Sequence, residues 1–280
     1  MRLNGRRQSS NFDDRRGRGV SSRLKVGGGI GAVIIAAIIA WISGGNPLGV
    51  IMQNAGQLTS GYSSTADGTY TPTAEEEQLA TFSRQILAGT EDVWTKLFAS
   101  QGLEYEAPTL VFYTGSVQSG CGNATAQVGP FYCSADQSLY IDLSFFSDMK
   151  QTLGADGDFA YAYVIAHEVG HHVQYLLGTL TDAHERMSKL NEADANKISV
   201  ALELQADYYA GVWAHHDNEL FGSIEEGDIE EALDAAQKIG DDYLQKRAQG
   251  YAVPDSFTHG TSAQRESALR SGISTGRFPQ

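Results

Sequence analysis

The chain has 280 residues, of which 41% are hydrophobic, 10% aromatic and 19% charged. This composition is typical of a globular protein with a hydrophobic core, and it excludes a disordered polyelectrolyte and a protein with many membrane spans. The formal net charge is −14. Because so acidic a chain repels phosphate groups, we expect no nucleic-acid partner.

The charge is distributed unevenly along the chain. Residues 1–25 carry eight basic and two acidic side chains, whereas the remainder carries 12 basic and 32 acidic ones. Residues 26–42 follow without a single charge and are mostly aliphatic. Their length is at the short end for a membrane-spanning helix, and Trp41 suits a membrane interface.

A cleaved signal peptide and a buried core helix are the alternatives for this hydrophobic segment. The sequence around Trp41 lacks the small-residue cleavage site of a signal peptide, and the flanking residues look unstructured. We therefore predict that residues 26–42 anchor the protein in the lipid bilayer as a single-pass cell membrane protein. The positive-inside bias then predicts that residues 1–25 form a basic cytoplasmic tail and that the chain after the anchor is extracytoplasmic.

A flexible tether and a folded domain are predicted next. Residues 43–73 are rich in Gly, Ser, Thr and Asn, a composition typical of a flexible linker. Thr73 and Glu76 form the sequence pattern of a capping box, and a helical pattern follows as far as Phe98. We therefore place a single folded domain at residues 74–280.

The domain is predicted to be α+β, with strands before most of the helices. Alternating or apolar runs predict strands at 109–114, 127–133 and 138–143, which we expect to form a small antiparallel sheet. The pattern is then helical over roughly 144–153, 158–178, 182–216, 225–248 and 262–271.

Only two cysteines occur, Cys121 and Cys133. They form no CxxC motif, so a thiolate metal site has little support. Outside the cytoplasm a cysteine pair is more often oxidised than free, and we predict a disulfide that closes a loop.

The central motif is HExxH, formed by residues 167–171 within a predicted helix. Positions i and i+4 share one face of a helix, so His167 and His171 can bind the same ion. Glu168 points away from that face, yet it can reach a water molecule on the metal. Two structural histidines on a buried helix are the alternative reading of this motif.

A hydrolytic zinc site needs a third protein ligand and an open position. The metzincin extension is excluded, because Gln174 and Leu177 stand where that class has Gly and His. The best candidate downstream is Glu203, with Asp207 one helical turn later. Buried acids need a cationic partner, and a metal ligand plus a carboxylate that orients a ligand imidazole would explain both. An exposed acidic face is the alternative.

These motifs resemble a known family. The HExxH motif followed by residues 203–207 is similar to the gluzincin arrangement, and the whole chain resembles the bacterial neutral zinc metallopeptidase family. The matching stretches are residues 1–11, the hydrophobic segment, 129–137, 140–146, 166–174, 203–213, 256–260 and 263–265. The resemblance implies a zincin-like, zinc-dependent peptidase with one Zn²⁺ per chain. It also implies His167, His171 and Glu203 as ligands and Glu168 as the catalytic residue.

The remaining histidines are weaker candidates. His259 lies in a predicted loop flanked by Gly and hydroxyl residues, and such loops often carry active-site groups. We predict that it could stabilise the oxyanion formed on a peptide carbonyl. His172 is expected to be structural or exposed.

The predicted activity is hydrolysis of a peptide or protein substrate whose identity the sequence does not specify. Zinc-bound water would attack the carbonyl, with Glu168 as general base and Asp207 orienting a ligand imidazole. Two alternatives stay open: a catalytically silent zinc-containing envelope binding or assembly protein, and a zinc amidase that acts on cell-wall peptides.

Overall fold

The structure, a computed structural model, describes residues 1–18 and 70–278. The predicted anchor, residues 26–42, and most of the predicted tether lie outside the described residues. Within the part of the chain that is described, every helix is too short or too polar to cross a bilayer.

The first helix of the domain, α3 (Ala74–Ser100), begins as predicted. The Thr73 hydroxyl accepts a hydrogen bond from the Glu76 amide, and the Glu76 carboxylate accepts one from the Thr73 amide. This capping box satisfies two amides that a helix start otherwise leaves unpaired. The other helices are α4 (Ser144–Asp148) with a π-helical turn at Met149–Leu153, α5 (Asp158–Leu176), α6 (Thr179–Met187), α7 (Glu192–Phe221), α8 (Asp228–Lys238), α9 (Asp241–Gln249) and α10 (Ser262–Thr275).

Two of the predicted helices are each divided in two. The predicted helix 182–216 is interrupted because the Asn191 side chain accepts a hydrogen bond from the Asp194 amide and so starts α7. The predicted helix 225–248 is interrupted at Gly240, where a Cβ would lie 2.3 Å from the backbone nitrogen of Ser262. A short polar cap and a close backbone approach therefore set these boundaries.

The sheet is mixed rather than antiparallel, which corrects the prediction. Its strand order is β1-β2-β6-β5. Strand β2 (Thr109–Tyr113) pairs in parallel with both β1 (Phe12–Asp14) and β6 (Ser138–Asp142), and only β5 (Phe131–Cys133) is antiparallel to its neighbour β6. The chain between β2 and β6 is long enough for a parallel return, because it contains a separate hairpin and β5.

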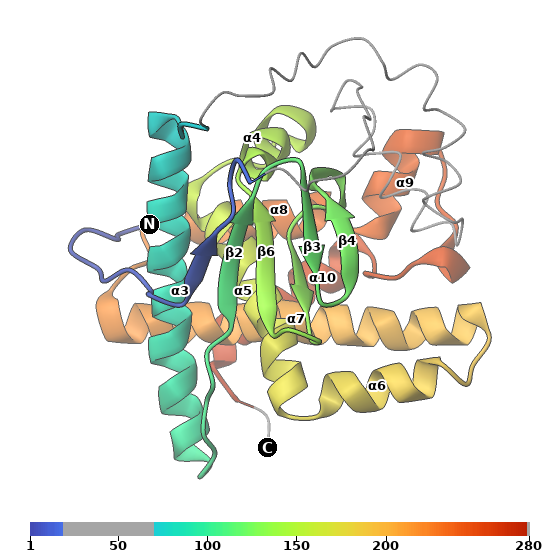
Figure 1. The fold of residues 1–280 in the computed structure, drawn as a ribbon. Coiled ribbons are helices and arrows are strands. Elements are labelled where there is room, and N and C mark those ends of the chain that lie inside the picture. Colours follow the sequence, from blue (N-terminus) through green and yellow to red (C-terminus); the bar gives the residue numbers. More distant parts are fainter. Residues whose placement is uncertain (19–69, 279–280) are drawn as a thin grey trace.

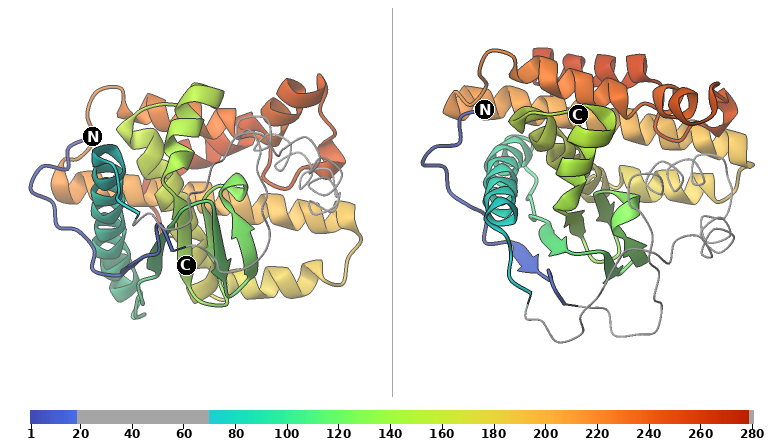
Figure 2. Two further views of the ribbon diagram at one scale, coloured as in Figure 1. Left: turned by 45° about the horizontal axis from the view of Figure 1, so that its top comes forward. Right: turned by 90° about the horizontal axis from the view of Figure 1, so that it is seen from above.

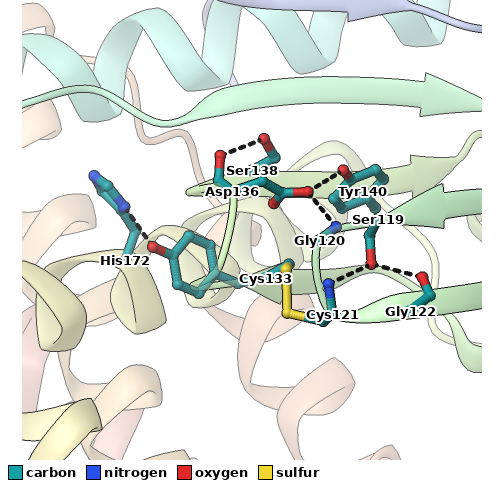
Figure 3. The surroundings of a disulfide bond; sticks show 10 residues. Ser119, Gly120, Cys121, Gly122, Cys133, Asp136, Ser138, Tyr140 and His172 are labelled. Atoms are coloured by element: carbon teal, nitrogen blue, oxygen red, sulfur yellow. Dashed lines mark hydrogen bonds between the residues drawn. A yellow bond between two sulfur atoms is a disulfide. The ribbon is translucent and has the colours of Figure 1, made fainter.

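The hairpin, β3 (Ser116–Ser119) with β4 (Gly122–Thr125), is joined to β5 by the predicted disulfide. Cys121 and Cys133 are bonded, with their Cα atoms 5.8 Å apart, which confirms that prediction. The Asp136 carboxylate reinforces the junction by accepting hydrogen bonds from the Gly120 amide and the Tyr140 hydroxyl (Figure 3).

Helix α5 lies between the sheet and the pair formed by α7 and α10 (Figures 1 and 2). Of its 19 residues, 14 are buried. It contacts β5, α3, α6, α7 and α8. The HExxH helix is therefore the centre of the core, and the elements around it fix its position.

Residues 1–18, which we call the N-terminal arm, pack against this domain (Figure 1). The sequence did not predict this packing of residues 1–18 against the domain. The backbone forms β1, and the Leu110 amide donates to the carbonyl of Asn11. Arg6 makes two hydrogen bonds, of 3.0 and 2.6 Å, to the Asp217 carboxylate, which is fully buried.

Other arm residues also neutralise acids of the domain. The Met1 ammonium lies 3.1 Å from Asp228, which is 4% exposed. Glu91, 8% exposed, accepts hydrogen bonds from Arg7, Ser9 and Asn11. The arm therefore supplies partners for three buried carboxylates that would otherwise be costly to bury.

This arrangement predicts that Arg6→Ala destabilises the domain. The substitution leaves the Asp217 carboxylate buried without its cation, which typically costs about 3–5 kcal/mol in the free energy of unfolding. Urea unfolding of the full chain measures this cost. Arg18→Ala is the matched control, because Arg18 is 70% exposed and its ion-pair partner is 3.8 Å away. Equal stability of the two variants would show that the arm contributes little to the fold.

Candidate metal site

The two histidines of the HExxH motif face the same space between α5 and α7. Their ring centroids are 4.8 Å apart. The helices approach closely at this point because Gly170 has no side chain; a Cβ there would lie 2.9 Å from the carbonyl oxygen of Ala206. The glycine within the motif thus allows α7 to place its own side chains next to the two imidazoles.

Glu203 on α7 supplies the third group. Its carboxylate oxygens lie 3.1 Å from Nε2 of His167 and 3.4 Å from Nε2 of His171. One ligand atom from each of the three residues lies within 4.8 Å of the others. Two imidazoles and one carboxylate are a ligand set that hydrolytic zinc enzymes use.

The second nitrogen of each imidazole is engaged by an acceptor. Nδ1 of His167 donates to Asp207 over 2.7 Å, and Nδ1 of His171 donates to the side-chain oxygen of Gln174 over 2.9 Å. Gln174 is itself held by a 2.7 Å hydrogen bond to the carbonyl of Leu202. In a neutral imidazole these bonds leave the Nε2 lone pair free to bind a metal, so the donor set fits zinc.

Asp207 is fully buried and accepts hydrogen bonds from four nitrogen and oxygen atoms around it. Besides His167, it binds the Arg265 guanidinium over 2.8 and 3.0 Å and the Tyr163 hydroxyl over 2.6 Å. Burial raises the pKa of this carboxyl, but the positive charges of Arg265 and His167 outweigh burial and lower it to about 2. Asp207 is therefore a permanent negative charge behind the imidazole of His167.

The imidazoles bind a proton tightly when no metal is present. Burial lowers the pKa of His167, but Asp207 and Glu203 have the larger combined effect and raise it to about 10. Burial also lowers the pKa of His171. The nearby Glu203 carboxylate opposes this effect, and the pKa of His171 is raised overall. A metal ion must therefore displace protons, so its affinity falls as pH falls.

Glu168 lies near His167 and His171, whose charges act on its carboxyl, and is 8% exposed. Burial raises the pKa of its carboxyl, while the charges of His167 and His171 lower it to a smaller extent. The backbone of Tyr132 on β5 also acts to lower this pKa, to a still smaller extent. A buried carboxylate with a raised pKa is suited to accept a proton and to return it.

His259 lies in the loop before α10, near the site but outside the three-residue ligand set. Its amide and its Nδ1 both contact Asp241, over 2.7 and 3.2 Å. Its charge is among the groups that lower the pKa of Glu203, so the two side chains share one environment. Its role towards an oxyanion stays a prediction.

His172 was expected to be either structural or exposed. The structure shows that it is a buried structural residue. It is fully buried; Nε2 donates to the Glu106 carbonyl over 2.6 Å, and Nδ1 accepts from the Tyr132 hydroxyl over 2.9 Å (Figure 3). Burial lowers its pKa to about 4. The neutral ring therefore ties α5 to β5 next to Glu168.

Three residues of the site were not identified from the sequence. Tyr163 precedes His167 by one helical turn and Gln174 follows His171 by three positions, so helical spacing could have suggested both. Arg265 comes from α10, and no local pattern connects it with Asp207.

Together, a HExxH helix, a glutamate from a second helix and a buried aspartate behind one histidine define a candidate metal site of the hydrolytic zinc type. The whole chain, residues 1–280, matches the family described as "Putative neutral zinc metallopeptidase". The protein belongs to this family.

Its relatives carry no assigned activity in their names. The chain is 47% identical to "Uncharacterized protein YpfJ" of Escherichia coli K12, covering 99% of this chain and 96% of that protein. It is 39% identical to "Uncharacterized protein Mb2605" of Mycobacterium bovis and to "Uncharacterized protein Rv2575" of Mycobacterium tuberculosis H37Rv, over 66% of this chain and 63% of each relative. No solved structure matches the chain significantly.

Proposed function

We propose that the protein is a zinc-dependent peptidase in which His167, His171 and Glu203 hold one Zn²⁺ per chain and Glu168 is the general base. The observation that carries this proposal is the orientation of the two imidazoles. Their Nδ1 atoms are bound by Asp207 and Gln174, which turns both Nε2 atoms towards Glu203.

The bound ion would supply Lewis acidity to the scissile carbonyl and to a water molecule. The protein supplies the proton transfers. Glu168 accepts a proton from the attacking water and later delivers it to the leaving amine nitrogen. Asp207 keeps His167 in one tautomer throughout, and Arg265 keeps Asp207 ionised.

An extended peptide suits the surroundings of Glu168 better than a compact ligand does. The strand next to Glu168, β5, is the last strand of the four-stranded sheet. Extended peptides commonly bind by adding a strand to the edge of a sheet. This favours a peptide substrate, although a zinc amidase acting on cell-wall peptides would need the same ligands.

We expect Glu168→Gln to separate the enzyme from a zinc-containing assembly protein. The amide keeps the size of the side chain but cannot accept a proton, so kcat should fall by about 10²–10⁴-fold while zinc content is unchanged. Hydrolysis of a mixture of unfolded-protein peptides, and in parallel of cell-wall peptides, measures the effect and distinguishes the two substrates. Glu226→Gln is the control, because Glu226 is exposed and follows the end of α7, about five helical turns beyond Glu203. Equal activity of wild type and Glu168→Gln would exclude Glu168 as the base.

Two features of the structure favour an extracytoplasmic location for the domain. The Cys121–Cys133 disulfide favours an oxidising, extracytoplasmic compartment. The arm contacts favour the same compartment for residues 1–18, since a single crossing by residues 26–42 would separate Arg6 from Asp217. We therefore propose that arm and domain lie together outside the cytoplasm, in place of the predicted cytoplasmic N-terminus.

Cysteine labelling tests this arrangement. Ser10→Cys in the arm and Ser271→Cys on α10 are exposed positions. A membrane-impermeant maleimide should label both variants in cells whose cytoplasmic membrane is intact. Labelling of Ser271→Cys alone would restore the cytoplasmic N-terminus, and labelling of neither until the cells are lysed would place both segments in the cytoplasm.

A further inference from the structure

A second group of metal-ligating side chains lies near the end of α7. It consists of His215, His216 and Glu219, whose ligand atoms lie within 4.8 Å of one another. The candidate catalytic site uses none of the three. They follow Glu203 and Asp207 on the same helix by about two to four helical turns.

The two imidazoles of this group are oriented by backbone carbonyls. Nδ1 of His215 lies 2.8 Å from the carbonyl oxygen of Ile273, and Nε2 of His216 lies 2.7 Å from that of Gly276. A carbonyl oxygen only accepts hydrogen bonds, so both nitrogens must carry a proton. In the neutral rings the opposite nitrogens therefore have free lone pairs.

Those opposite nitrogens both face Glu219. Nε2 of His215 lies 3.5 Å from one carboxylate oxygen, and Nδ1 of His216 lies 2.8 Å from the other. The arrangement resembles that of the first site, where each imidazole also donates the N–H of its second nitrogen to a fixed acceptor. A protonated pair of imidazoles would satisfy the same atoms, so metal and protons compete here.

Gly276, at the C-terminal end of α10, lies directly against His215. It caps α10 with φ +58°, and a Cβ at this position would lie 2.3 Å from the His215 ring. The His215 and His216 side chains are 28% and 20% exposed, which leaves the group accessible from solvent.

We propose that His215, His216 and Glu219 bind a second divalent ion of the borderline class, such as Zn²⁺, which ties the end of α10 to α7. Nitrogen and carboxylate ligands of this kind suit zinc, with water completing the coordination. The site is structural, because no acid corresponding to Glu168 contacts the group among the described residues.

The position of this second ion connects it with the first site. α7 and α10 run side by side in the same direction and touch through their backbones; a Cβ at Gly272 would lie 2.1 Å from the Tyr208 carbonyl oxygen. The same two helices carry Asp207 and Arg265, whose ion pair supports His167. An ion at the far end of the pair therefore holds together the helices that orient a catalytic ligand.

Zinc stoichiometry of the full-length protein tests the proposal. Native mass spectrometry and calorimetric titration should find two Zn²⁺ per chain in wild type and one in the double variant His215→Ala/His216→Ala. Glu219→Gln should weaken the second binding event at least about 10-fold. The matched control is Glu226→Gln, an exposed acid beyond the end of α7, which should leave both events unchanged.

Glu203→Gln makes the two sites distinguishable. With the first site impaired, this variant should still bind one Zn²⁺, and zinc should still raise its unfolding temperature. In Glu203→Gln combined with His215→Ala/His216→Ala, zinc should no longer do so. Saturation of wild type at one ion, or two ions retained in the double histidine variant, would overturn the second site without affecting the proposed peptidase.

Discussion

The buried carboxylate of Asp207 is the interaction on which the arrangement of the site depends. It joins three helices, because it accepts hydrogen bonds from Tyr163 and His167 on α5 and from Arg265 on α10, while it belongs to α7 itself. A charge this deeply buried is tolerated only with a partner of opposite charge and good geometry. The helices must therefore come close together, and the glycine contacts between α5, α7 and α10 make that approach possible.

A second set of buried charges extends the fold to the beginning of the chain. Asp217, Asp228 and Glu91 receive their cations and donors from the N-terminal arm. Asp217 is on the same helix as Asp207, so α7 is held at one point by α5 and α10 and at another by Arg6. The basic character of the arm, which suggests a cytoplasmic tail when the sequence is considered alone, thus has a structural explanation within the domain.

The sequence predicts local features well and long-range ones poorly. The HExxH spacing, the capping box at Thr73 and the cysteine pair are short patterns with a direct physical meaning, and the structure reproduces all three. The parallel pairing of β2 with β6 was not predicted, because pairing direction depends on the path of the intervening chain. Arg265 and the docking of the arm were missed for the same reason: each pairs a charge with an acid far away in sequence.

The central claim is that one zinc ion is held by His167, His171 and Glu203. Zinc X-ray absorption spectroscopy tests it most directly, on full-length His215→Ala/His216→Ala protein, which lacks the proposed second site, loaded with less than one equivalent of metal. We predict a four-coordinate spectrum with only nitrogen and oxygen ligands and with scattering from two imidazoles, and a loss of this spectrum when Glu203→Gln is added to the same variant. An identical spectrum with and without Glu203→Gln in this variant would contradict the account, because Glu203 could not then be a ligand.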